Sequence, residues 1–349
     1  MSGERDGRVM HHIHVSAPAG VVYAVLADAA KLALYCPQIV HVESLESDGV
    51  RERLRTWSLM GGRVRSWTTW RHLDPVERRV EVGQKLPGSP LDSVRGVLSI
   101  RPEGPRDTVL ELRFGLDDLP ETEWVEQTAG LDVRAQLTQL KSFAERWTRL
   151  DDLLLSFEDS IRVDGPAELA YDFLYRAGGW PELVPDVARV ALVEDSPGVQ
   201  RMTLERLTEN GSQTTEAVRI CFPHAGRIVY KQMAALPLLA AHTGEWSVVP
   251  DERGTIVTAK QTVVLREEAV PVVLGRDADL ADAGRHVRAV LGRDSLSLLS
   301  LARQYAESGV RTLTPATTTA ATVTAMATVT AMAGGRGRSR GRATVTPLL

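Results

Sequence analysis

The chain of 349 residues is long enough for two domains, each with its own hydrophobic core. With 43% hydrophobic and 25% charged residues, its composition is that of a globular protein. A formal net charge of −4 gives no electrostatic reason to expect binding to nucleic acid or to a membrane surface.

The amino-terminal stretch MSGERDGRVMHHIHV lacks the apolar segment of a secretory signal, and no apolar run is as long as a membrane span. Cys36 and Cys221 lie far apart, and neither has a CxxC partner, so we expect free thiols in a reducing compartment. These features predict a cytoplasmic protein. His12 and His14 would share one strand face, but no third ligand of clear spacing accompanies them, which argues against a metal site.

The first elements in chain order are a short strand at residues 12–15 and a helical region after Pro18, where proline suits a helix start. The apolar stretch VVYAVLADAAKLALY continues this region up to Pro37. Alternating segments separated by SDG, LDP, LPGSP and RPEGP then predict a run of antiparallel strands. A long helix is predicted last, from the spacing of Leu137, Leu140, Ala144 and Trp147.

The same pattern then recurs. HIHVSAPAGVVYAVL aligns with SIRVDGPAELAYDFL at an offset of 148 residues. The offset also pairs Pro37 with Pro185, Arg71 with Arg219, and Gly96 with Gly244. Matches in one register over roughly ninety residues indicate a duplicated domain. The second copy also ends in a helical stripe, between residues 287 and 305.

Each copy therefore reads as a strand, short helices, a run of antiparallel strands and one long helix. A curved sheet wrapped around the long helix buries this pattern and leaves a cavity between them. We predict an N-terminal domain at residues 1–153 and a C-terminal domain at residues 154–308. Residues 309–349 are rich in Thr and Ala and then in Gly and Arg, which predicts a disordered tail rather than a nucleic-acid-binding segment.

The stretch RSWTTWRHLDP at residues 65–75 raises the question of a functional face. Read as a strand, it puts Trp67, Thr69 and Arg71 on one side, because side chains alternate with period two. That side is either solvent-exposed or the wall of a pocket. The recurrence of arginine at position 219 favours the pocket wall.

Several segments resemble a known protein family. APAGVVYAVLAD, CPQIVHVESLE and RVRSWTTWRHLDP are similar to the amino-terminal half of the di-domain aromatase/cyclases of bacterial type II polyketide pathways. DGPAELAYDFLYRAGGWPELVPDVARV, EAVRICFP, RIVYKQ and AAHTGEW are similar to the carboxy-terminal half. The resemblance spans roughly residues 10 to 306. It implies an α+β protein of two tandem helix-grip domains of the START/Bet v 1-like type.

The resemblance also implies a function. Such an enzyme folds a poly-β-ketone tethered to an acyl carrier protein and promotes cyclisation, dehydration and aromatisation of the first ring, with no metal or redox cofactor. Further partners would be the ketosynthase/chain-length factor and a ketoreductase. The alternative is a non-catalytic START-like protein that carries or shields a hydrophobic small molecule. A carrier needs an apolar cavity, whereas the enzyme needs polar residues that point inward.

Four residues are the catalytic candidates. Arg71 and Arg219 would hold carbonyl oxygens and stabilise enolate charge, because a guanidinium is a poor proton shuttle. Thr69 would hydrogen-bond a ketone or a water molecule. His242 is the acid/base candidate, because its ordinary pKa lies near neutrality.

The substrate-binding candidates are two tryptophans and two glutamines, namely Trp67, Trp246, Gln84 and Gln232. The tryptophans offer flat walls but are equally typical of a core, and the alternative for the glutamines is that they satisfy buried backbone groups. The copies also differ, since GGWPELVP in the second stands where the first has KLALYCP. We therefore expect the two copies to have specialised.

Overall fold

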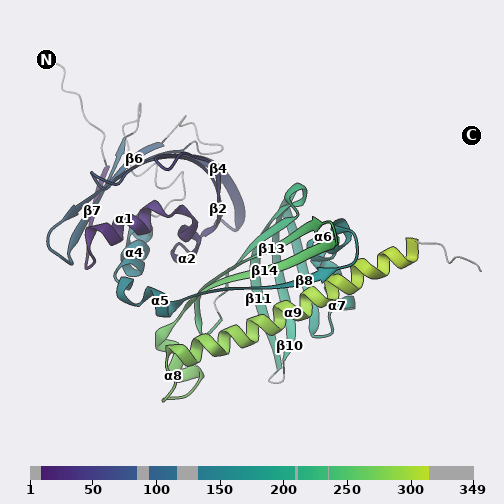
Figure 1. Ribbon diagram of the computed structural model, residues 1–349. Helices are drawn as coiled ribbons and strands as arrows, with labels where there is room; N and C mark the ends of the chain where they lie inside the picture. Colours follow the sequence, from purple (N-terminus) through teal and green to yellow (C-terminus); the bar gives the residue numbers. More distant parts are fainter. Residues whose placement is uncertain (1–8, 85–93, 116–132, 209–210, 235, 314–349) are drawn as a thin grey trace, which may run out of the picture. The chain divides into compact units, whose positions relative to one another are not determined.

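The computed structural model describes residues 9–84, 94–115, 133–208, 211–234 and 236–313, which form two similar copies (Figure 1). The strands of the N-terminal copy are β1 (Val9–Val15), β2 (Ile39–Ser47), β3 (Arg51–Met60), β4 (Arg63–Asp74), β5 (Arg79–Gln84), β6 (Val94–Pro102) and β7 (Thr108–Gly115). Its α-helices are α1 (Ala19–Ala27), α2 (Leu32–Tyr35), α4 (Val133–Ala144) and α5 (Leu150–Leu153).

The C-terminal copy repeats this order of elements. Its strands are β8 (Leu154–Val163), β9 (Val187–Ser196), β10 (Val199–Thr208), β11 (Gly211–Phe222), β12 (Arg227–Gln232), β13 (Leu239–Asp251) and β14 (Gly254–Leu265). Its α-helices are α6 (Ala167–Tyr175), α7 (Trp180–Leu183), α8 (Val270–Val273) and α9 (Leu280–Leu313).

Within the described residues, each copy is built on one antiparallel sheet of seven strands. The strand order is β1-β7-β6-β5-β4-β3-β2 in the first sheet and β8-β14-β13-β12-β11-β10-β9 in the second. The first strand of each copy therefore pairs with its last strand, and the others follow as a meander. This architecture confirms the predicted pair of tandem helix-grip domains.

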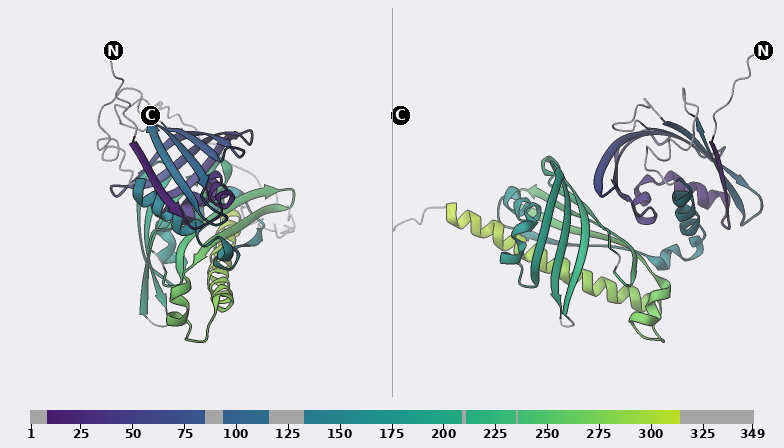
Figure 2. Two further views of the ribbon diagram at one scale, coloured as in Figure 1. Left: turned by 90° about the vertical axis from the view of Figure 1, so that its left-hand side faces the viewer. Right: turned by 180° about the vertical axis from the view of Figure 1, so that it is seen from behind.

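The long helix α9 covers the sheet of the C-terminal copy (Figure 1; Figure 2, right-hand view). It packs against β8, β14 and α6. Its buried stripe contains Leu298, Leu299, Ala302 and Ala306, in which Ala302 follows the two adjacent leucines by three or four residues and Ala306 follows Ala302 by four. Each leucine removed from water in this way contributes about 1.5–3 kcal/mol, which holds the helix on the sheet.

The duplication extends to the bounds of individual elements. Helices α1 and α6, and strands β3 and β10, β4 and β11, and β5 and β12, begin and end 148 residues apart. Gly96 lies opposite Val82, as Gly244 lies opposite Tyr230, so the same offset holds for β6 and β13.

Beyond these strands the offset between the copies changes. The hydroxyl of Thr108 donates to the carbonyl of Ala17, and that of Thr255 donates to Gly165, so β7 and β14 are 147 residues apart. The carboxylates of Glu145 and Glu307 accept from the backbone amides of Ser16 and Asp164, which aligns the final helices at 162 residues. These equivalences give a residue-by-residue comparison of the two copies.

The predicted domain boundaries are not tested by these contacts and stay predictions. The second sheet begins at Leu154, and α9 continues to Leu313, past the expected start of the tail at residue 309. The rest of the predicted tail lies outside the described residues. Cys36 and Cys221 are buried free thiols, as expected, and burial raises the pKa of the Cys36 thiol to about 12 and that of Cys221 to about 11.

Candidate active site

The candidate face of strand β4 is buried and not exposed to solvent. Trp67, Thr69 and Arg71 are buried, whereas Thr68 and Trp70 between them are exposed. The three candidates therefore share the inner face of the sheet, as the alternation predicted. Gln84, at the end of β5, lies opposite Thr69 in the strand register.

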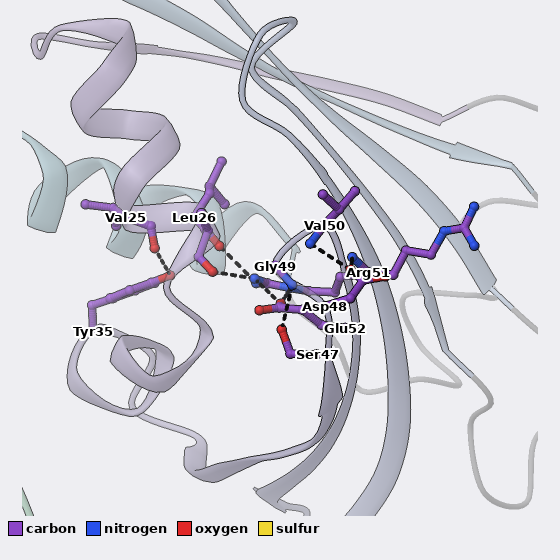
Figure 3. Close-up of polar contacts among 11 residues, drawn as sticks. Val25, Leu26, Tyr35, Ser47, Asp48, Gly49, Val50, Arg51 and Glu52 are labelled. Atoms are coloured by element: carbon purple, nitrogen blue, oxygen red, sulfur yellow. Dashed lines mark hydrogen bonds and ion pairs between the residues drawn. The ribbon is translucent and has the colours of Figure 1, made fainter.

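The guanidinium of Arg71 is fully engaged by neighbouring groups. Its Nη1 donates to the carbonyl of Leu26 at 2.9 Å, its Nη2 to the carbonyl of Ala27, and its Nε to Glu52 at 3.0 Å. In Figure 3, Leu26 and Glu52 lie within one cluster of polar contacts, which are drawn as dashed lines. The last carbonyls of α1 lack partners within the helix, and its last turn contains no basic residue. Arg71 therefore caps α1, and Glu52 neutralises its charge.

Arg219 caps α6 in the same way but keeps its charge. Its Nη2 donates to the carbonyl of Leu174, and its Nη1 lies 3.5 Å from the carbonyl of Tyr175. Glu52 and Arg71 are cross-strand neighbours, and the same position beside Arg219 is occupied by the neutral Gln200. No carboxylate among the described residues forms an ion pair with Arg219.

The environment of Arg219 is buried and aromatic. The side chain is completely buried, and its guanidinium carbon lies 5.8 Å from the ring of Trp180 and 5.6 Å from that of Trp246. Both ring faces attract a cation. Burial lowers the pKa of the guanidinium, because desolvation disfavours the charged form. The C-terminal copy thus contains a buried positive charge that no carboxylate compensates.

A cavity of about 310 Å³ lies between the sheet and α9 in the C-terminal copy. Arg219, Gln232, His242 and Trp246 all contribute to its wall, so four of the residues predicted from the sequence come together. Trp180, Tyr230, Gln261 and Ser295 also line it. The wall therefore combines flat aromatic surfaces with several polar groups.

Sequence reasoning missed Tyr230, Gln261 and Ser295. The ring of Tyr230 lies across Gly244, where an added Cβ would be 2.3 Å from the Tyr230 hydroxyl oxygen. Glycine at position 244 therefore marked a place where a side chain crosses the backbone, but the sequence did not reveal which one. Gln261 and Ser295 stand alone in otherwise ordinary strand and helix patterns and give no local signal.

Four buried polar atoms in residues of this cavity wall have no hydrogen-bond partner among the described residues, and one of them, Nε of Arg206, forms an ion pair with Asp186 at 3.1 Å. The other three have no partner of either kind in that part of the chain. They are Nε of Arg219, Oε1 of Gln232 and Nδ1 of His242. One is a donor and one an acceptor, and the third depends on the histidine tautomer. Leaving such groups unpaired costs about 1–3 kcal/mol each. The residues that carry these atoms all line one cavity, which makes this cavity the candidate site for a polar ligand.

Comparison with known proteins places this geometry in a family. The family model described as polyketide cyclase/dehydrase and lipid transport matches the chain twice, at residues 6–145 and 155–300. The chain belongs to the polyketide cyclase/dehydrase family. The two matches correspond to the two copies, and the resemblance inferred from the sequence is confirmed.

Curated relatives of the whole chain are cyclase/dehydratases. The actinorhodin polyketide synthase bifunctional cyclase/dehydratase of Streptomyces coelicolor is 35% identical over 86% of this chain and 96% of its own length. The granaticin polyketide synthase bifunctional cyclase/dehydratase of Streptomyces violaceoruber is 33% identical over 86% of this chain and 94% of its own. The chain is accordingly an enzyme of the cyclase/dehydratase class.

Two solved di-domain structures are similar to this chain over most of its length. The di-domain ARO/CYC BexL of the BE-7585A biosynthetic pathway has a TM-score of 0.78 and 35% identity, covering 86% of this chain and 98% of BexL. The di-domain ARO/CYC StfQ of the steffimycin pathway has the same TM-score at 29% identity, covering 87% of this chain and 99% of StfQ.

Two structural features are absent from the described residues. None of their helices combines the length and apolar character that a membrane crossing needs. In the same part of the chain, no cluster of three or more His, Cys, Asp or Glu side chains is placed to hold a metal ion.

Proposed function

We propose that this enzyme folds a poly-β-ketone carried on an acyl carrier protein and promotes aldol closure of the first ring, dehydration and aromatisation. The relatives are components of polyketide synthases, which supports a synthase as the source of the substrate. Docking of the acyl carrier protein itself, and of the ketosynthase/chain-length factor or a ketoreductase, is part of the proposal. The C-terminal cavity is the candidate site.

The observation that carries this proposal is that the residues bearing these unpartnered polar atoms, Arg219, Gln232 and His242, all line one cavity. A poly-β-ketone alternates carbonyl oxygens with acidic methylene groups, so it presents acceptors for Arg219 and protons for a base. The uncompensated charge of Arg219 favours the enolate that forms when such a methylene loses a proton. Trp180 and Trp246 provide flat surfaces for the developing ring.

The same lining argues against the carrier alternative. A protein that only shields a hydrophobic molecule has no use for a buried, uncompensated guanidinium, and it gains nothing from unpaired polar atoms. Arg219, Gln232 and His242 all line this cavity, which favours catalysis over carriage.

For the N-terminal copy we propose a supporting role. Arg71 is occupied by α1 and Glu52, so it has little capacity left for a substrate oxygen. A direct catalytic part for Arg71 and Thr69, and substrate contacts for Trp67 and Gln84, stay predictions. Mutation of each residue, followed by product analysis, separates these roles.

The experiment is a reconstituted minimal type II polyketide synthase with wild-type protein or with Arg219→Ala. Wild-type protein should redirect the poly-β-ketone from spontaneous shunt products to one cyclised, dehydrated product. Arg219→Ala should lose about 2–4 kcal/mol of barrier stabilisation, or roughly thirty- to a thousandfold in rate. Arg219→Lys should restore only part of this, because an ammonium lacks the planar fork. A product profile unaffected by wild-type protein would refute the proposed function.

A further inference from the structure

The carboxamide of Gln261 is the centre of a buried hydrogen-bond network in the C-terminal cavity. Its Oε1 accepts from the hydroxyl of Tyr230 at 3.0 Å and lies 2.5 Å from Nε2 of His242. Its Nε2 donates to Oγ of Ser295 at 2.7 Å. All four side chains line the cavity, and they come from β12, β13, β14 and α9.

This network determines which nitrogen of His242 holds the proton. An amide oxygen is only an acceptor, so Nε2 of His242 must be the N–H donor. In the neutral ring the lone pair is then on Nδ1, which is buried and has no partner among the described residues. Burial lowers the pKa of the ring, which favours its neutral form. The other titratable groups lining this cavity are Arg206, Arg219, Tyr230, His286 and Asp294.

Among its described residues, the N-terminal copy has no counterpart of this network. The equivalences between the copies place Val82 at the position of Tyr230, Val94 at that of His242, Phe114 at that of Gln261 and Val133 at that of Ser295. Four polar residues in one copy thus correspond to four apolar residues in the other. Arg71 and Arg219, by contrast, cap equivalent helices in both copies.

We propose that proton transfer belongs to the C-terminal copy, where Gln261 positions His242 as the general base that acts through Nδ1. This inference rests on the proposed function. In the dehydration step, Nδ1 accepts the proton from the carbon beside the carbinol, and the electrons of that C–H bond form the new C=C bond. The C–O bond breaks, and the hydroxyl leaves with the proton from Nδ1 as water. The imidazole returns to its neutral form, and Nε2–H stays on Gln261.

The tautomer can be observed without turnover. Long-range ¹H–¹⁵N correlation spectra of the full chain with ¹⁵N-labelled histidine report which ring nitrogen is protonated, and His242→Gln assigns the signal. We expect the Nε2–H form in the wild type and a loss of this fixed form in Gln261→Leu. Gln232→Leu is the matched control, because it makes the same change in the same cavity without touching His242. An Nδ1–H ring, or a tautomer indifferent to Gln261→Leu, would overturn the assignment.

A second variant guards against simple misfolding of Gln261→Leu. Gln261→Glu keeps an acceptor for both Tyr230 and His242 and adds a negative charge, which raises the pKa of His242. The acid limb of the pH–rate profile should therefore move to higher pH, while the Nε2–H tautomer persists. An unmoved acid limb in folded Gln261→Glu would count against His242 as the base.

Activity in the reconstituted synthase completes the test. His242→Gln should slow formation of the dehydrated product by about a hundredfold or more, the usual contribution of a general base. Thr243→Val, the neighbouring position on β13 outside the cavity lining, should keep the wild-type rate. If Arg219→Ala abolishes the product and His242→Gln leaves it unchanged, the proposed function stands and this inference fails. If wild-type protein itself does not change the product profile, the proposed function has failed first.

Discussion

Glu52 and Gln200 differ by one charge, and that difference separates the two arginines that cap α1 and α6. Arg71 shares its charge with a carboxylate 2.7 Å away, whereas Arg219 lies beside a neutral amide and between two tryptophans. A carboxylate beside a guanidinium cancels most of its field, so only Arg219 can lend its full charge to an enolate. The two arginines therefore have different roles, although they occupy equivalent positions in the two copies.

The burial of His242 leads to a further prediction, which concerns the stability of the fold rather than the rate of the reaction. Because its pKa in the folded state is lowered by burial, the unfolded chain binds the proton first as the pH falls. The free energy of unfolding should thus lose a contribution below about pH 6.5, the ordinary pKa of histidine. Urea unfolding at neutral pH and at mildly acidic pH measures this loss. His242→Gln should make it smaller, and an equal loss in both proteins would contradict the burial of a neutral ring.

At the scale of elements, each copy ties its first helix to the middle of its sheet with an arginine. The carbonyls at the end of α1 and of α6 accept from a strand that is distant in sequence, so the helix end and the inner face of the sheet are fixed together. Tyr35 adds a contact in the N-terminal copy, where its hydroxyl donates to the carbonyl of Val25 (Figure 3). The position of this first helix in turn affects the size of the space above the sheet.

Arg71→Ala should consequently destabilise the fold. The substitution removes the cap of α1 and leaves the carboxylate of Glu52, which is only 17% exposed, without its partner. We expect a loss of about 2–4 kcal/mol in the free energy of unfolding, with Arg71→Lys recovering only part. Chemical denaturation of the full chain measures it. Unchanged stability together with lost activity would instead support a direct catalytic part for Arg71.

The sequence was sufficient to predict the elements but not the site in full. Period-two alternation on β4 and helical spacing at the end of each copy are local signals, so the buried face and the covering helix could be predicted. Gln261 and Ser295 become partners only when β14 meets α9, and a single glutamine in a strand carries no sign of that meeting. The sequence repeat showed the 148-residue offset only over the first part of each copy. The later elements, which are related by offsets of 147 and 162 residues, lie outside that part and could not be aligned from the sequence.

At the scale of the whole molecule, duplication explains how one chain can separate support from chemistry. Both copies match the same family model and retain the sheet, the first helix and the capping arginine. The polar network centred on Gln261 and the uncompensated charge of Arg219 are found in the C-terminal copy. A duplicated domain tolerates such divergence, because the remaining copy is free to keep a structural task.

We propose that the chemistry takes place beside an uncompensated Arg219. Exchanging the residues that lie beside the two arginines, Glu52 and Gln200, tests this proposal. Gln200→Glu gives Arg219 the carboxylate that Arg71 already has, and Glu52→Gln removes that carboxylate from Arg71. The measurement is the yield of cyclised, dehydrated product when each folded variant is added to the reconstituted synthase. We predict that folded Gln200→Glu loses about tenfold or more of the rate, because the added charge weakens enolate stabilisation. Glu52→Gln should be less stable but keep the wild-type product. Wild-type product from Gln200→Glu, together with loss of product from folded Glu52→Gln, would contradict the account.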